Sequence, residues 1–120
     1  MATLLPIHAR RAIHDLQHKS IHLQLKGETT MKAIALLEVQ AMVAAIAGLD
    51  AMVKAADVKL IHVEKRLGGR MVTIVVEGEV SAVQAALDAG AAAAAEVGNV
   101  KVREVIARPH PDVMKFLTTG

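Results

Sequence analysis

The sequence predicts one domain of mixed α/β (α+β) class with a ferredoxin-like β-α-β-β-α-β order. An antiparallel sheet carries both helices on one face, and a short helix follows at the C-terminus. Four short apolar runs rich in valine and isoleucine have the length and composition of strands. Two longer alanine-rich segments have helical length. The two middle runs are separated by a few residues that include Gly68 and Gly69, which predicts a tight connection between paired strands.

The first strand is predicted at 32–39 and the first helix at 40–56. The strand is a short continuous apolar run, which is typical of burial on both faces. The helix is rich in alanine, the strongest helix former. It is also indicated by larger apolar side chains that recur at spacings of three and four: Met42, Ile46, Leu49 and Val53.

The paired strands are predicted at 58–65 and 71–77, and the second helix at 79–97. The apolar side of this helix carries Val80, Val83, Ala86, Leu87 and Ala91. The alanines of 91–95 have no bulky side chain, so this end packs only where another backbone comes close. A fourth strand is predicted at 101–107. An irregular link at 108–111 then leads to a final helix at 112–117, with Asp112 as its N-cap.

Residues 1–30 differ in composition from the domain at 31–120. They hold four of the six histidines, and we expect a flexible extension or an upstream start-site artefact. If part of this stretch is helical, His14, His18 and His22 share a face, a spacing that can bind a divalent metal. Carboxylate ligands are sparse there, so a basic tail explains the same residues better and no metal site is predicted.

Composition excludes several functional classes. The chain has no cysteine and 1% aromatic residues, with a net charge of +2, so it lacks the basic footprint and stacking platforms of a nucleic-acid binder. No apolar stretch approaches the ~20 residues of a membrane-spanning helix. Alanine and valine side chains each bury little apolar area, so the core of a single copy is weakly stabilised. A partner subunit can supply the missing buried area, and the composition therefore favours an oligomer.

No catalytic constellation or cofactor motif is present, so we predict neither an enzyme nor a cofactor. His62 and His110 are the only histidines after residue 30, and the one serine in this region, Ser81, lies on a predicted helix. His62 alternates with apolar residues along a strand. His110 stands between two prolines, where a rigid turn explains it.

Residues 31–117 resemble a bacterial microcompartment shell protein of the single-domain, hexamer-forming class. No single motif carries the resemblance, but five segments occur in the order and spacing of that family. They are ALLE at 35–38, DAMVKAA at 50–56, VTIVVEGEV at 72–80, AVQAALDAG at 82–90 and VIARPH at 105–110.

The resemblance implies a structural subunit that forms a homo-hexamer, tiles edge to edge with other shell proteins and encloses enzymes in a compartment in the bacterial cytoplasm. Lys54 and Arg108 match residues of the hexamer–hexamer edge, with His110 in the same R-P-H turn and Asp57 beside the edge lysine. The loop implied to line a central pore for small polar metabolites consists of Arg66, Leu67, Gly68, Gly69 and Arg70.

This chain departs from the family pattern at three places. Val39, Gln40 and Ala41 stand where a polar residue, lysine and glycine are usual. Asp57 replaces a frequent asparagine, where it either pairs with Arg108 or disturbs the edge contact. The 66–70 loop is about one residue longer than usual.

The loop arginines permit two interpretations. If Arg66 or Arg70 faces the opening, repeated copies favour anions. Otherwise they point into bulk water or pair with Glu64 or Glu77.

Two alternative functions fit the same strand order. An oligomeric ferredoxin-like regulatory domain would bind a small molecule between subunits. An acylphosphatase-like hydrolase would need an arginine-bearing phosphate loop after the first strand, and Val39, Gln40 and Ala41 provide none.

Overall fold

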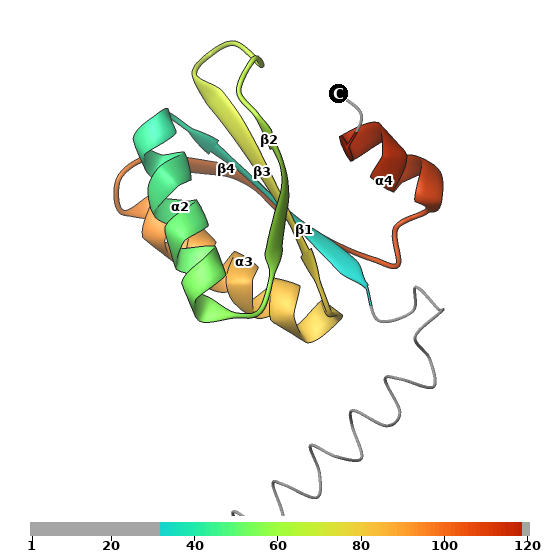
Figure 1. Ribbon diagram of the computed structural model, residues 1–120. Helices are drawn as coiled ribbons and strands as arrows, with labels where there is room; N and C mark the ends of the chain where they lie inside the picture. The colour runs from blue at the N-terminus through green and yellow to red at the C-terminus, as the bar shows by residue number, and fades with distance from the viewer. Residues whose placement is uncertain (1–31, 119–120) are drawn as a thin grey trace, which may run out of the picture.

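The computed structural model describes residues 32–118, in which four strands and three helices follow one another (Figure 1). They are β1 (Ala33–Gln40), α2 (Met42–Ala55), β2 (Lys59–Glu64), β3 (Met71–Gly78), α3 (Val80–Ala95), β4 (Asn99–Ala107) and α4 (Pro111–Thr118). The predicted order is confirmed, and every boundary agrees within two residues. The predictions for residues 1–30, including the face shared by His14, His18 and His22, lie outside the described residues.

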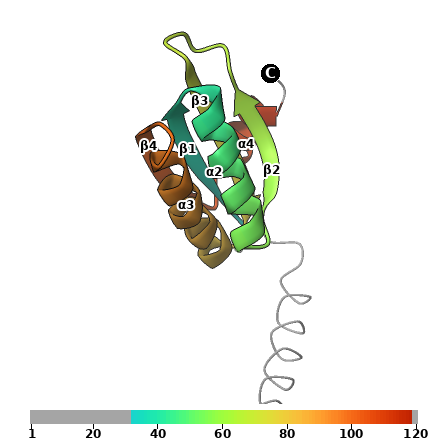
Figure 2. The same cartoon turned by 90° about the vertical axis from the view of Figure 1, so that its left-hand side faces the viewer.

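The four strands form one antiparallel sheet in the order β2-β3-β1-β4. Helices α2 and α3 cover one face, as predicted, and α4 lies on the opposite side (Figures 1 and 2). The face opposite α2 and α3 is called the open face below. None of the helices in residues 32–118 has the length and hydropathy needed to cross a bilayer.

The core lies between the sheet and the α2/α3 layer, and it is built largely from small side chains. Alternate residues of β1 face the helices and are fully buried, as period-two strand geometry requires: Ala33, Ala35, Leu37 and Val39. The two helices meet at Gly48 and Gly90, where an added Cβ on Gly48 would lie 3.2 Å from the Gly90 carbonyl oxygen. The helices therefore pack almost backbone to backbone, as the alanine-rich sequence predicts.

Three of the four spaced apolar residues of α2, Met42, Ile46 and Val53, are exposed, whereas Leu49 is partly buried against the core. Their spacing correctly predicts a helix, but the buried side carries small residues and Met52 instead. The outer face of α2, defined by four exposed side chains, is 43–66% accessible: Met42, Val43, Ile46 and Val53. An apolar stripe of this kind on a small domain is typical of a surface that a partner covers.

The start of α4 differs from the prediction. The helix begins at Pro111, and proline is a favoured residue at the first position of a helix. The backbone N–H of Asp112 donates to His110 Nδ1 at 3.0 Å. The prediction of Asp112 as the N-cap is therefore wrong, because the His110 imidazole accepts the first free helical N–H. The turn that contains His110 is a capping structure.

The turn between α3 and β4 depends on a close backbone approach at Gly98. A Cβ there would lie 2.7 Å from both the Gln40 carbonyl oxygen and the Ala44 Cβ. We expect Gly98→Ala to lower the free energy of unfolding by about 1–3 kcal/mol, because neither neighbour is a flexible side chain. Urea denaturation measures this loss.

Ser81→Ala, at an exposed position of α3, is the control and is expected to change stability by less than about 0.5 kcal/mol. Equal stability of the two variants would show that the α3–β4 turn tolerates a Cβ.

Candidate loop and edge sites of a shell subunit

The loop between β2 and β3 projects beyond one end of the sheet (Figure 1). Gly68, Gly69 and Arg70 have φ values of 78°, 60° and 62°, so three successive residues adopt the left-handed conformation. The N–H of Met71 donates to the Gly68 carbonyl at 3.0 Å and closes the turn. The two glycines adopt this conformation without steric cost, whereas Arg70 does so at a cost of about 1–2 kcal/mol.

Residues at the end of β1 hold this loop in place. The N–H of Ala41 donates to the Arg70 carbonyl at 2.9 Å, and Gln40 Nε2 donates to the Gly69 carbonyl at 2.9 Å. Ala41 has φ 86° and ψ 148°, a region that is almost restricted to glycine. Sequence reasoning marked residues 39–41 as atypical but did not assign them to the loop.

The loop is basic and exposed. Arg66 has an 87% exposed side chain, and its Nε lies 3.8 Å from Glu64 Oε2. The N–H of Arg66 also donates to this carboxylate at 3.1 Å and lowers the pKa of Glu64, outweighing the opposing effect of desolvation. The hydrogen bond from His62 adds to the lowering.

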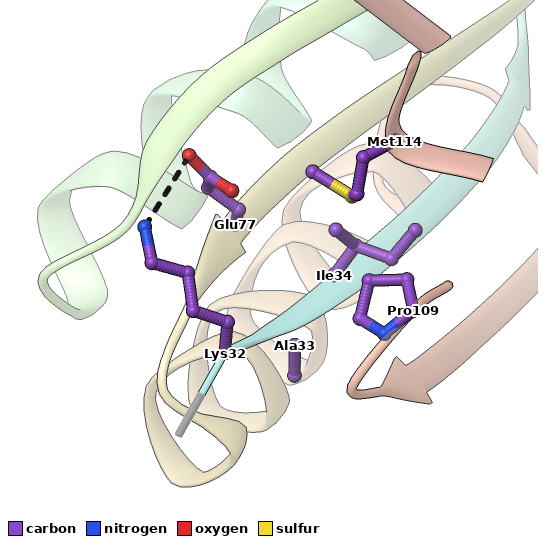
Figure 3. A pocket seen from close by; sticks show the side chains of 6 residues that line it. All are labelled: Lys32, Ala33, Ile34, Glu77, Pro109 and Met114. Atoms are coloured by element: carbon purple, nitrogen blue, oxygen red, sulfur yellow. Dashed lines mark ion pairs between the residues drawn. The ribbon is translucent and has the colours of Figure 1, made fainter. Parts of the chain in front are cut away.

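Arg70 has no carboxylate within ion-pair distance among residues 32–118. The predicted alternative of pairing with Glu77 is wrong, because Glu77 lies toward the opposite end of β3 and its Oε1 is 4.0 Å from Lys32 Nζ. Lys32 and Glu77 also line a small pocket of about 60 Å³, in which Met114 of α4 lies next to Ile34 (Figure 3).

The predicted edge residues all lie at the end of the sheet opposite the loop. Asp57 contacts Gly78 at the end of β3, since an added Cβ on Gly78 would lie 3.0 Å from the Asp57 carbonyl oxygen. The N–H of Arg108 donates to the Lys32 carbonyl at 2.8 Å, where β1 begins. His110 follows in the same turn.

Lys54 and Asp57 flank the β2 side of this end, and Arg108 flanks the β4 side. Lys54 Nζ lies 2.8 Å from Asp50 Oδ2 in an exposed i,i+4 ion pair. Among the described residues no ion pair joins Asp57 to Arg108, so that predicted pairing is not formed within one chain.

The open face carries a groove of about 540 Å³ between the sheet and α4. In it Thr73 Oγ1 donates to Glu38 Oε1 at 3.3 Å. Within residues 32–118, no three histidine, aspartate or glutamate side chains are grouped so as to hold a metal ion. The lining residues come from three strands, the loop and α4: Leu36, Glu38, His62, Glu64, Arg66, Leu67, Thr73, Val75, Phe116 and Leu117.

Comparison with known proteins identifies this architecture. The profile of the BMC domain matches residues 33–109. The chain belongs to the BMC-domain family of bacterial microcompartment shell proteins. Its BMC domain is 52% identical over 89 residues to the bacterial microcompartment shell protein PduA of Citrobacter freundii, a match that covers 74% of this chain and 95% of the relative.

Two further relatives support the same family. The shell protein EutM of Escherichia coli K12 is 47% identical over 90 residues, covering 75% of this chain and 92% of EutM. The crystal structure of a microcompartment protein from Desulfitobacterium hafniense is 31% identical with a TM-score of 0.67, covering 75% of this chain. This chain covers 48% of the length of the Desulfitobacterium hafniense protein.

Family membership confirms the predicted class of function. The chain is a structural subunit of a bacterial microcompartment shell in the cytoplasm, and shell proteins of this family are not enzymes. These relatives support the shell-protein interpretation rather than the regulatory domain or the hydrolase.

The backbone at Ala41 predicts an unusual stabilising substitution. We expect Ala41→Gly to raise the free energy of unfolding by about 1 kcal/mol, because relief of strain exceeds the entropy that glycine adds to the unfolded chain. Thermal and urea denaturation measure the gain.

The matched control is Ala47→Gly, inside α2, which is expected to lower stability by about 0.5–1 kcal/mol. A loss of stability in both variants would mean that Ala41 is unstrained.

Proposed function

We propose that six copies of this chain form a closed ring with the 66–70 loops around the central opening and Lys54, Asp57, Arg108 and His110 at the perimeter. The observation that carries the proposal is the position of these two groups at opposite ends of one sheet. Eight-residue strands separate the groups by about 26 Å. A subunit oriented with its strands along the radius of a ring presents one group to the axis and the other to neighbouring rings.

Two separate apolar surfaces support a ring. A closed ring of identical subunits needs two different surfaces on each copy, because each contact is head to tail. The outer face of α2 is one such surface. The second is the open face, where four apolar side chains of β4 and α4 are 38–79% exposed: Val102, Ile106, Val113 and Phe116. We infer that the outer face of α2 in one copy packs on the open face of the next.

The ring is proposed to tile with other shell proteins around enclosed enzymes, and its opening passes small polar metabolites. Residues 64–70 carry three basic side chains and one carboxylate in every copy. Glu64 offsets part of the Arg66 charge, whereas Arg70 is unpaired among the described residues. Repeated around an axis, these side chains produce a positive potential that favours anions over neutral solutes.

The Lys54→Ala substitution distinguishes the formation of rings from the assembly of rings into sheets. We expect the wild type to form rings of six by native mass measurement and flat sheets or tubes by negative-stain imaging. Lys54→Ala is expected to keep the ring mass and to lose most sheets, because the Lys54 side chain is 73% exposed near the end of α2 and is not one of the apolar residues that define the two proposed ring surfaces.

Asp50→Ala is the matched control, because it removes the same exposed ion pair inside the chain but keeps the lysine. It is expected to form sheets like the wild type, since such a pair contributes only about 0.3–0.5 kcal/mol. Wild-type dimers would overturn the ring, and normal sheets from Lys54→Ala would remove Lys54 from the edge.

The loop arginines are tested by solute flux through assembled shells. Arg66→Ala and Arg70→Ala are expected to lower anion flux several-fold, with the larger effect at the unpaired Arg70, and to leave flux of a neutral solute of equal size unchanged.

Lys59→Ala, which removes one positive charge near the opposite end of the sheet, is the control for net charge. Unchanged anion flux in both arginine variants would show that neither side chain faces the opening.

A further inference from the structure

The side chain of Gln40 connects three segments that are distant in sequence. Its Nε2 donates to the Gly69 carbonyl at 2.9 Å, and its Oε1 accepts from Asn99 Nδ2 at 3.3 Å. Gln40 is the last residue of β1 and lies between Met71 of β3 and Asn99 of β4 in the sheet register. One carboxamide therefore links the loop to the first residue of β4.

This bridge requires both halves of the amide. Lysine at position 40 would donate to the Gly69 carbonyl but could not accept from Asn99, and glutamate would accept but could not donate. The contact also requires Gly98, because its missing Cβ lets the α3–β4 turn approach the Gln40 backbone. Asn99 and Gly98 thus help to keep Gln40 Nε2 directed at the Gly69 carbonyl.

The neighbouring backbone adds a second attachment point. The N–H of Ala41 donates to the Arg70 carbonyl, so donors of two successive residues, Gln40 and Ala41, hold two successive loop carbonyls. Ala41 and Arg70 both have positive φ values, and such conformations persist only where surrounding contacts enforce them. Loss of the Gln40 contact leaves the strained loop with one fewer restraint at the residue before Arg70.

We propose that Gln40 is a positioning residue that fixes the conformation of the 66–70 loop and thereby sets the bore of the ring opening. This inference rests on the proposed ring for its effect on permeation, but the effect on loop order is a property of the single chain. Selectivity then depends on a side chain outside the loop, and Asn99 acts on the loop through Gln40.

Hydrogen exchange tests the restraint. Gln40→Met is expected to speed exchange of the Ala41 and Met71 amides by about three- to tenfold, the effect of one lost hydrogen bond. Gln40→Lys keeps the donor and is expected to give a smaller increase, as is Asn99→Ala. The double variant with Met at 40 and Ala at 99 is expected to exchange no faster than Gln40→Met alone, since Asn99 acts through the same bridge.

Permeation distinguishes positioning from general stability. In shells built from rings whose mass is that of six copies, Gln40→Met is expected to change the size of the largest solute that passes. Gly98→Ala tests the same bridge from the β4 side. Gln84→Met is the matched control, because Gln84 is an exposed glutamine whose Nε2 donates to Asp88 Oδ1 at 3.2 Å on α3, away from the loop.

The outcomes separate the two proposals. Unchanged exchange in Gln40→Met, or additive effects of the Gln40 and Asn99 substitutions, would overturn the positioning role while leaving the ring intact. Faster exchange with an unchanged size cut-off in normal rings would overturn the link to the bore. If the wild type forms no ring, the proposed function fails, and the exchange data still decide whether Gln40 orders the loop.

Discussion

The close approach of backbones within the helical layer is the constraint on which the rest of this fold depends. Gly48 and Gly90 let α2 and α3 meet almost without side chains between them, and Gly98 lets the following turn reach the Gln40 carbonyl. A layer built this way is thin and has few large side chains to bury. Four bulky apolar residues of α2 are left outside, where they are 43–66% exposed, whereas Met52 is fully buried and Leu49 packs partly buried against the core. The composition that limits the core of one copy thus also leaves an exposed apolar surface on α2, which is the surface proposed to pack on the next copy.

The sheet separates the two sets of residues that are proposed to be functional. At one end the β2–β3 loop combines glycines with arginines. At the other end lie Lys54 in the last turn of α2, Asp57 in the turn before β2, and Arg108 and His110 in the turn after β4. Antiparallel pairing fixes which turns share an end, so the separation follows from the order of the strands alone. The same pairing brings Gln40 and Asn99 next to the loop. The proposed axial and perimeter positions and the proposed restraint on the loop therefore all depend on one strand register.

The sequence predicted the element order well, because strand and helix periods, glycine pairs and alanine-rich runs are local signals. It could not predict which side of α2 is buried, since the spacing of Met42, Ile46 and Val53 fits either an inward or an outward face. It misassigned the cap of α4 because a histidine ring, an unusual cap, precedes Pro111. The pore-loop and edge roles were assigned from the family resemblance alone and stay predictions. Gln40 was noticed as a departure but not as a contact, because its partners at Gly69 and Asn99 are 29 and 59 residues away.

The central claim is that the 66–70 loop lies near the axis of a six-fold ring and the Lys54 end lies at its perimeter. The chain has no cysteine, so single labels can be placed at Leu67→Cys or Asp57→Cys without removing native thiols. Distances between spin labels on neighbouring subunits measure the radius directly, because neighbour distance equals radius in a six-fold ring. The account predicts that the nearest-neighbour distance for Asp57 labels exceeds that for Leu67 labels by roughly 20 Å, given strands about 26 Å long. A longer distance between Leu67 labels than between Asp57 labels would contradict it.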